Sequence, residues 1–320
     1  MKHGNYCGYA LNDMLKMRSL LKDSKYIKST QIESALIDLL IQAQKFVLPT
    51  DGRLSDGCGV SSNPELIRLP YDIVALEYSA PTPKDQLVMG TELSTRRIVL
   101  AFDSKCAAQY SNLFDYTDED GIIVWPISYF DDVNKWTSSW AGTFIPLPLQ
   151  VSKGSINESC SDSFNKKIRQ FSAGDFTYNT KRLLHGEYAE DVVLATLKNG
   201  ENPDDCYIVD TSSEVTVAVD FCYTLNYRNV TVQKAEAEPR KSTVKKSPKR
   251  VFDHHYLVIN VDDTVRTKTS DIHKQSTSKC RHTRRRHLRR YANGKTKWIE
   301  AVEVNANKEE LVTKTYIIEN

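Results

Sequence analysis

A dense run of cations near the C-terminus contains the residues of this chain that are best suited to chemistry. Between Lys279 and Lys297 there are nine Lys or Arg and two His, with no carboxylate among them. Arginines dominate this run, which we call the basic segment (residues 279–297). Their planar guanidinium groups bind phosphate through paired hydrogen bonds and stack on bases. The basic segment therefore indicates a binding site for a polyanion.

Aromatic residues beside these cations favour a nucleic acid, with RNA preferred to DNA, because rings stack on unpaired bases. The cations and rings expected to make this contact are Arg281, Arg284, Arg285, Arg286, Arg289, Arg290, Tyr291, Lys295, Lys297 and Trp298. Two alternatives remain open. The partner is an acidic protein surface of the host, or the cations only keep an exposed edge strand from aggregating.

The histidines of the basic segment suggest a second function, cleavage of RNA without a metal. Such cleavage needs a base for the 2′-hydroxyl proton, an acid for the leaving oxygen and a cation for the phosphorane. His282 and His287 would be the acid and base, and Arg285 the cation. The enzyme assignment stays open, because neighbouring cations lower a histidine pKa and because sequence gives no geometry.

Metal and cofactor sites are not predicted. Cys280, His282 and His287 have the atom types of zinc ligands, but no second pair completes a tetrahedral set at the usual spacing. Asp262-Asp263 with Asp253 could hold magnesium, although paired Asp after a strand is commonly a turn. The glycine motifs of phosphate-loop, dinucleotide-binding and serine-hydrolase proteins are absent.

The charge of the chain is strongly divided along its length. Residues 231–298 hold 19 Lys/Arg and 6 Asp/Glu, a net of +13, whereas the other residues hold 24 and 35, a net of −11. Seven scattered cysteines without a CxxC pair indicate reduced thiols. No apolar stretch is long enough to span a membrane, and no signal peptide is recognised, so we expect no membrane partner and a cytoplasmic protein.

The elements that must position these residues begin with a helix expected at Gln31–Val47, with Thr30 and Glu33 as its capping box. Strands are expected where β-branched and aromatic runs lie between Gly, Pro, Asp and Asn clusters. These runs are Ile67–Ser79, Arg97–Phe102, Gly121–Tyr129 and Thr143–Val151.

The second half has a helical pattern at Lys181–Leu197, whereas Glu214–Leu225 fits a strand or a buried helix. A mobile basic loop is expected at residues 235–250 and a strand at His255–Val261. Asn293-Gly294 favours a tight turn in a hairpin. The strands of that hairpin and the last strand are expected at Arg286–Tyr291, Thr296–Val304 and Leu311–Glu319.

The pattern around His282-Thr-Arg-Arg-Arg-His287-Leu-Arg-Arg, followed by Gly294-Lys295 and Trp298, resembles a signature of tailed-bacteriophage proteins of unknown function. Further matches occur in the same order along the chain, at Leu69-Pro-Tyr71, Leu225-Asn-Tyr-Arg-Asn-Val230 and Lys314-Thr-Tyr316. Arg286 stands where the family usually has Gly. The resemblance implies a phage protein acting in the cytoplasm of an infected bacterium, and it favours a helix at Glu214–Leu225.

Together these patterns predict an α+β protein with antiparallel or mixed sheets, a few helices and a C-terminal basic β-hairpin. An acidic N-terminal module is expected at residues 1–151 and a linker or loop at 152–165. A basic C-terminal module is expected at 166–320.

Overall fold

The computed structural model describes most of the first half of the chain and several short strands of the second. Residues 5–22, 25–52, 54, 64, 67–80, 94–149 and 180–225 are described with their side chains. The backbone alone is described for strands at 87–88, 91–92, 151–153, 176–178, 231–235, 255–260, 282–284, 287–290, 296–299, 302–304 and 314–319.

Two helices open the described chain. In α1 (Tyr6–Leu21), the buried side chains Cys7, Ala10, Leu11 and Met14 recur at helical spacing. Helix α2 (Ile27–Gln42) buries a wider apolar face that includes Leu36, Leu39 and Leu40. The chain then enters strand β1 (Gln44–Val47), so the helix expected at Gln31–Val47 begins earlier and ends earlier than predicted.

Carboxylates from distant elements cap both helices. Glu77 accepts hydrogen bonds from the backbone N–H groups of Tyr6 and Cys7, at 2.9 Å each. Glu187 accepts them from Lys28 and Ser29, at 3.1 and 2.9 Å. These contacts satisfy N–H groups that a helix leaves unpaired in its first turn. The helix start was predicted wrongly because the cap of α2 comes from about 160 residues away, which local sequence does not encode.

The predicted capping box at Thr30 and Glu33 is absent. Thr30 lies inside α2, where its hydroxyl donates to the Tyr26 carbonyl at 2.7 Å. The Glu33 carboxylate is buried and bonds to side chains of other elements instead.

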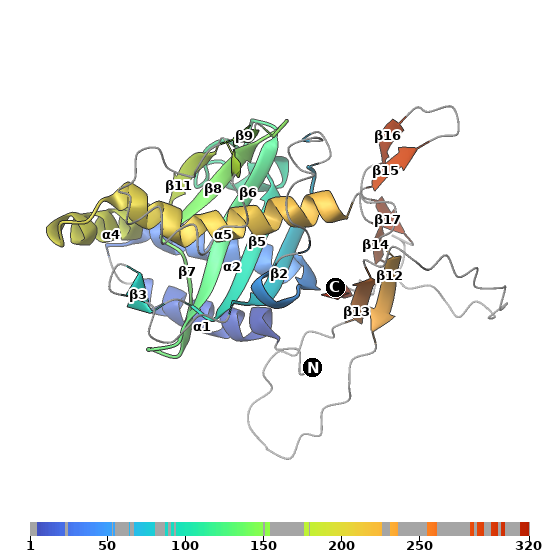
Figure 1. Ribbon diagram of the computed structural model, residues 1–320. Coiled ribbons are helices and arrows are strands. Elements are labelled where there is room, and N and C mark those ends of the chain that lie inside the picture. Colours follow the sequence, from blue (N-terminus) through green and yellow to red (C-terminus); the bar gives the residue numbers. More distant parts are fainter. Residues whose placement is uncertain are drawn as a thin grey trace, which may run out of the picture.

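A mixed sheet forms the centre of the molecule (Figure 1). Its order is β11-β8-β6-β5-β2-β1-β18-β13-β12, with β7 paired to β6. Strand β1 is parallel to β2 and β18, and β18 is parallel to β13, while the other neighbours are antiparallel. The strands with described side chains, besides β1, are β2 (Ile73–Ser79), β5 (Arg96–Asp103), β6 (Gly121–Phe130), β7 (Lys135–Ser138), β8 (Ala141–Pro146) and β11 (Lys181–Leu184). This arrangement confirms the α+β class and the mixed sheet.

The central strands are buried on both faces, because helices cover both (Figure 1). Along β5, Ile98, Leu100 and Phe102 pack with α1 and α2, whereas the alternate residues Val99 and Ala101 pack beneath α5. This period-2 division of side chains gives two separate apolar cores. The sheet therefore separates an α1–α2 layer from an α5 layer.

Two helices follow strand β11. Residues 181–184 form this edge strand, and α4 (Gly186–Lys198) begins only at Gly186, whose φ of +57° interrupts the helix expected from Lys181. Helix α5 (Pro203–Thr224) includes most of Glu214–Leu225, which confirms the helix favoured there. Elements assigned to the predicted second module thus pack on the same sheet as the first, and the domain division stays a prediction.

Short strands complete the described backbone. Those of the C-terminal part are β12 (Thr231–Ala235), β13 (His255–Asn260), β14 (His282–Arg284), β15 (His287–Arg290), β16 (Thr296–Ile299), β17 (Val302–Val304) and β18 (Lys314–Glu319). Small two-stranded sheets join β14 with β17, β15 with β16, β9 (Val151–Lys153) with β10 (Phe176–Tyr178), and β3 (Leu87–Val88) with β4 (Thr91–Glu92). Among the described residues, 3-10 helices lie at Thr50–Gly52 and Ser104–Tyr110. The strand expected at His255–Val261 is confirmed by β13.

Candidate functional site

The predicted binding residues lie on or between short C-terminal strands whose side chains are outside the described residues. Those on strands are His282 and Arg284 in β14, His287, Arg289 and Arg290 in β15, and Lys297 and Trp298 in β16. Those outside the described residues altogether are Arg281, Arg285, Arg286, Tyr291 and Lys295. Of the loop predicted at 235–250, Ala235 is the last residue of β12, and residues 236–250 are outside the described residues as well.

The backbone register nevertheless brings cations to opposed positions. Strands β15 and β16 are antiparallel, with Arg289 opposite Lys297, Leu288 opposite Trp298 and Arg290 opposite Thr296. Like charges at directly opposed positions destabilise a pair of strands unless a counter-charge is present. The turn at Asn293-Gly294 lies outside the described residues, so the basic β-hairpin itself stays a prediction.

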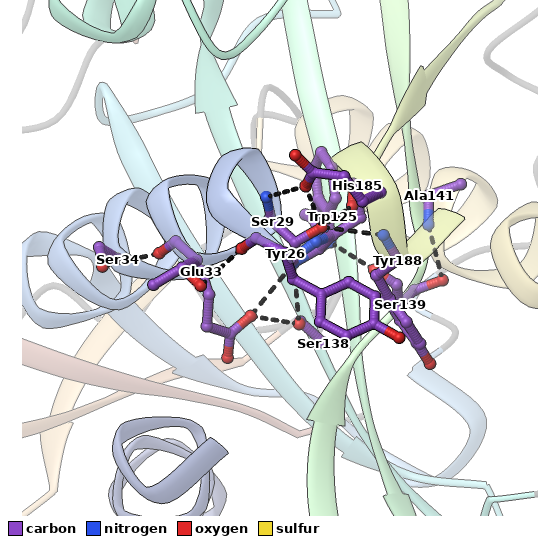
Figure 2. A network of polar contacts seen from close by, with 12 residues as sticks. Tyr26, Ser29, Glu33, Ser34, Trp125, Ser138, Ser139, Ala141, His185 and Tyr188 are labelled. Carbon is purple, nitrogen blue, oxygen red and sulfur yellow. Dashed lines mark hydrogen bonds and ion pairs between the residues drawn. The ribbon is translucent and has the colours of Figure 1, made fainter. Parts of the chain in front are cut away.

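Within the described side chains, a buried polar network joins α2, β7 and the start of α4 (Figure 2). The Ser138 hydroxyl donates to Glu33 Oε2 at 2.6 Å, and the same carboxylate oxygen lies 3.2 Å from His185 Nε2. Ser138 Oγ is also 3.4 Å from His185 Nε2. All three residues are buried, and the imidazole packs edge-on against Trp125.

This network holds Ser, His and a carboxylate, yet its geometry is not that of a nucleophilic triad. In a triad the carboxylate orients one imidazole nitrogen and the serine uses the other. Here Glu33 and Ser138 both approach Nε2, while Nδ1 is buried without a hydrogen-bond partner among the described residues. The Ser138 hydroxyl is buried and therefore not accessible to a substrate. The network joins three elements rather than performing catalysis.

A second hydrogen-bonded layer reinforces the first (Figure 2). The Ser29 hydroxyl donates to the His185 carbonyl at 2.7 Å and accepts from the Tyr188 amide at 2.9 Å. Glu187 accepts hydrogen bonds from the backbone amides of Lys28 and Ser29 at the start of α2. Although desolvation raises the pKa of the Glu187 carboxyl, these hydrogen bonds outweigh it, and the pKa is lowered. Helices α2 and α4 are therefore held together at their N-terminal ends.

A second group of charged side chains lies between α5 and the sheet. Arg97 donates to Glu214 Oε1 at 2.9 Å, and the Tyr78 hydroxyl donates to the same oxygen at 3.2 Å. Glu214 is only 1% exposed, and its Oε2 has no hydrogen-bond partner among the described residues. Although desolvation opposes it, the Glu214 carboxylate raises the pKa of the Arg97 guanidinium. The Arg97 guanidinium therefore stays protonated at neutral pH.

One helical turn before Glu214, Asp210 is exposed at the surface of α5 and accepts a 2.6 Å hydrogen bond from the Trp140 indole. Desolvation by the surrounding protein raises the pKa of the Asp210 carboxyl to about 6, and the nearby Glu214 charge adds to this effect. A carboxyl with such a pKa changes charge close to neutral pH.

The buried cysteines are not activated nucleophiles. Burial, followed by the neighbouring Glu77, raises the pKa of Cys7 well above its ordinary value, and burial raises the pKa of Cys222. The thiolate is the reactive form, so both thiols stay protonated at neutral pH. Among the described residues no group of three metal-ligating side chains comes together, and no helix has the length and apolar character of a membrane span.

No protein-family model, curated protein or solved structure matches this chain. Function therefore has to be argued from the residues themselves. Sequence reasoning missed both charged groups beneath the helices. A signal existed for Glu33 and Glu214, since each interrupts an apolar helical face, but their partners Ser138 and Arg97 lie more than 100 residues away.

Proposed function

We propose that this chain binds single-stranded nucleic acid, RNA in preference to DNA, through the basic segment. What carries the proposal is the coincidence of nine cations without a carboxylate and a register that opposes Arg289 and Lys297. Phosphates bound between such positions would supply the missing counter-charge. Trp298 and Tyr291 add stacking faces for unpaired bases.

In this proposal β15 and β16 form a basic β-hairpin that turns at Asn293-Gly294. The acidic remainder of the chain, with its net of −11, would repel a polyanion and so direct it to the basic segment. The resemblance to phage proteins supports placing this binding in the cytoplasm of an infected bacterium.

The test is fluorescence anisotropy with labelled single-stranded RNA, competed by unlabelled RNA or DNA of the same sequence. If the segment neutralises about five phosphates, affinity should fall about 100-fold between about 50 and about 200 mM salt. Affinity that does not change with salt would rule out phosphate contact.

A variant with R285A, R289A and R290A should lose most of this affinity. The matched control is K16A, K105A and K135A, which removes the same charge from exposed positions of the body. Equal losses in the two variants would show that net charge alone, and not this segment, attracts the nucleic acid.

The same RNA, run on a denaturing gel, tests the alternative in which His282 and His287 cleave it with Arg285. Cleavage that disappears in H287A while binding is retained would identify a ribonuclease. Absence of any nucleic-acid affinity would instead favour the host-protein alternative.

A further inference from the structure

The C-terminal half of α4 exposes an apolar face. Leu194 and Leu197, one turn apart, are 54% and 56% exposed, and Leu184 on the neighbouring edge strand β11 is 45% exposed. The opposite side of this helix packs on α2 and α5. Large apolar side chains gathered on one exposed helix face commonly mark an interaction surface. We call the surface formed by Leu194 and Leu197 the leucine face.

Acidic residues are frequent in α4 and the first half of α5. Residues 186–214 contain eight Asp or Glu and a single Lys. Among these, Glu190 and Asp210 are exposed, whereas the exposed Asp204 already pairs with Arg182 at 2.7 Å. A partner suited to this surface must therefore combine apolar side chains with several positive charges.

The basic segment of this same chain has that composition. Leu288 and Tyr291 stand among its cations, and Trp298 and Ile299 follow directly. Its lack of carboxylates complements the near absence of cations at residues 186–214. Charge complementarity of this kind determines which surfaces associate and how fast they do so.

The topology favours a contact between two copies over a contact within one. Strand β11, which leads into α4, is one edge of the main sheet, and β12 is the other. Eight strand spacings of about 4.8 Å separate these edges by about 38 Å. Figure 1 shows α4 at the end of the molecule opposite to β15 and β16.

We propose that the leucine face binds the basic segment of a second copy of this chain. Such a contact joins two different surfaces, so it is heterologous and continues head to tail from copy to copy. Because the basic segment is also the proposed nucleic-acid site, self-association and nucleic-acid binding would exclude each other.

The test uses two full-length variants that each damage one half of the contact. The face variant is E190K/L194K, and the segment variant is R289E/R290E. Light scattering coupled to gel filtration should show salt-sensitive oligomers of the wild type and monomers of each variant alone. An equimolar mixture should form a 1:1 dimer, because the intact segment of the face variant meets the intact face of the segment variant.

The matched control is D132K/V133K, which makes the same substitutions at another exposed acid and another exposed apolar residue, Val133 at 56%. It should associate like the wild type, and circular dichroism should show all three variants folded. A monomeric wild type, or a control as monomeric as the face variant, would overturn the proposal. A segment variant that still dimerises would show that two leucine faces pack together instead.

The outcome is separable from that of the proposed function. The face variant keeps the whole basic segment and should bind RNA with the wild-type affinity or better. A wild-type protein that self-associates but does not bind RNA would contradict the function proposed above and would leave this contact supported.

Discussion

Single buried polar residues tie the described layers together. Glu33 accepts a hydrogen bond from Ser138 on β7, and its carboxylate lies 3.2 Å from His185 Nε2 at the start of α4. The buried Glu77 and the half-buried Glu187 each accept two backbone amides of a helix in another part of the chain. A buried carboxylate that loses such a partner keeps its desolvation cost without compensation.

Ser138→Ala tests this at the Glu33 network. The substitution removes the 2.6 Å donor to a buried carboxylate, so we expect the free energy of unfolding in urea to fall by about 2 kcal/mol. Ser34→Ala is the control, because the Ser34 hydroxyl donates only to the Thr30 carbonyl within the same helix. This substitution should change the free energy of unfolding by only about 0.3 kcal/mol. Equal effects would mean that the network adds no stability.

Asp210→Asn tests the raised carboxyl pKa. Because the folded protein binds this proton more tightly than the unfolded chain, Asp210 lowers stability progressively as the pH rises from about 4 to about 6. Asn retains an oxygen that accepts from Trp140 and removes the titration. We expect the variant to gain about 1 kcal/mol at neutral pH relative to acid pH, a modest amount because solvent screens an exposed carboxyl.

Urea unfolding measured at several pH values gives the change of the unfolding free energy with pH for each protein. Glu190→Gln on α4 removes an exposed carboxyl of the same acidic region and is the control. If the wild type and Asp210→Asn have parallel stability profiles, the pKa of Asp210 is not raised.

At the scale of elements, the sequence locates strands better than it locates helix ends. Arg97–Phe102 and Gly121–Tyr129 correspond to β5 and β6 almost residue for residue, because continuous β-branched runs between turn residues define buried strands. Helix α1 was missed although the sequence holds a local cap signal, since the Asn5 side chain accepts from the Gly8 amide at 3.0 Å. Residues Lys181–Leu184 were assigned to a helix because their spacing continues that of α4.

Gly142 on β8 tests how tightly the sheet packs. A Cβ at this position would lie 2.4 Å from the Trp125 ring, which is itself fully buried. We therefore expect Gly142→Ala to lower the unfolding free energy by about 2 to 3 kcal/mol. At Gly200 after α4 a Cβ meets nothing, but φ is +76°, so Gly200→Ala should cost only about 1 kcal/mol. A smaller loss at Gly142 than at Gly200 would contradict this packing.

At the scale of the whole molecule, the charge separation seen in the sequence has a spatial counterpart. In the chain, the acidic α4–α5 region follows β11 at one edge of the sheet, and the basic segment connects β13 to β18, the second and third strands from the other edge. The sequence could predict the charges but not their placement, because the strand order depends on pairings such as β1 with β18 that have no local signal.

Nucleic acid should therefore disperse the head-to-tail oligomers. Adding single-stranded RNA at low salt is expected to lower the scattering mass per protein to that of one copy, since phosphates and the leucine face compete for the same cations. Neutral peptide nucleic acid of the same sequence is the control and should leave the oligomers intact. Oligomers that grow when RNA is added would show that the two contacts are compatible.

The position of β18 has a consequence for synthesis of the protein on the ribosome. Residues 45–47 of β1 pair with residues 315–317, so one side of an early strand is covered only after some 270 further residues have been made. Until then the backbone N–H and C=O groups on that side of β1 remain an open template for any extended chain nearby. Closing so long a loop is also intrinsically slow. We therefore expect the newly made chain to depend on chaperones, or on rapid release from the ribosome, more than other chains of this size do.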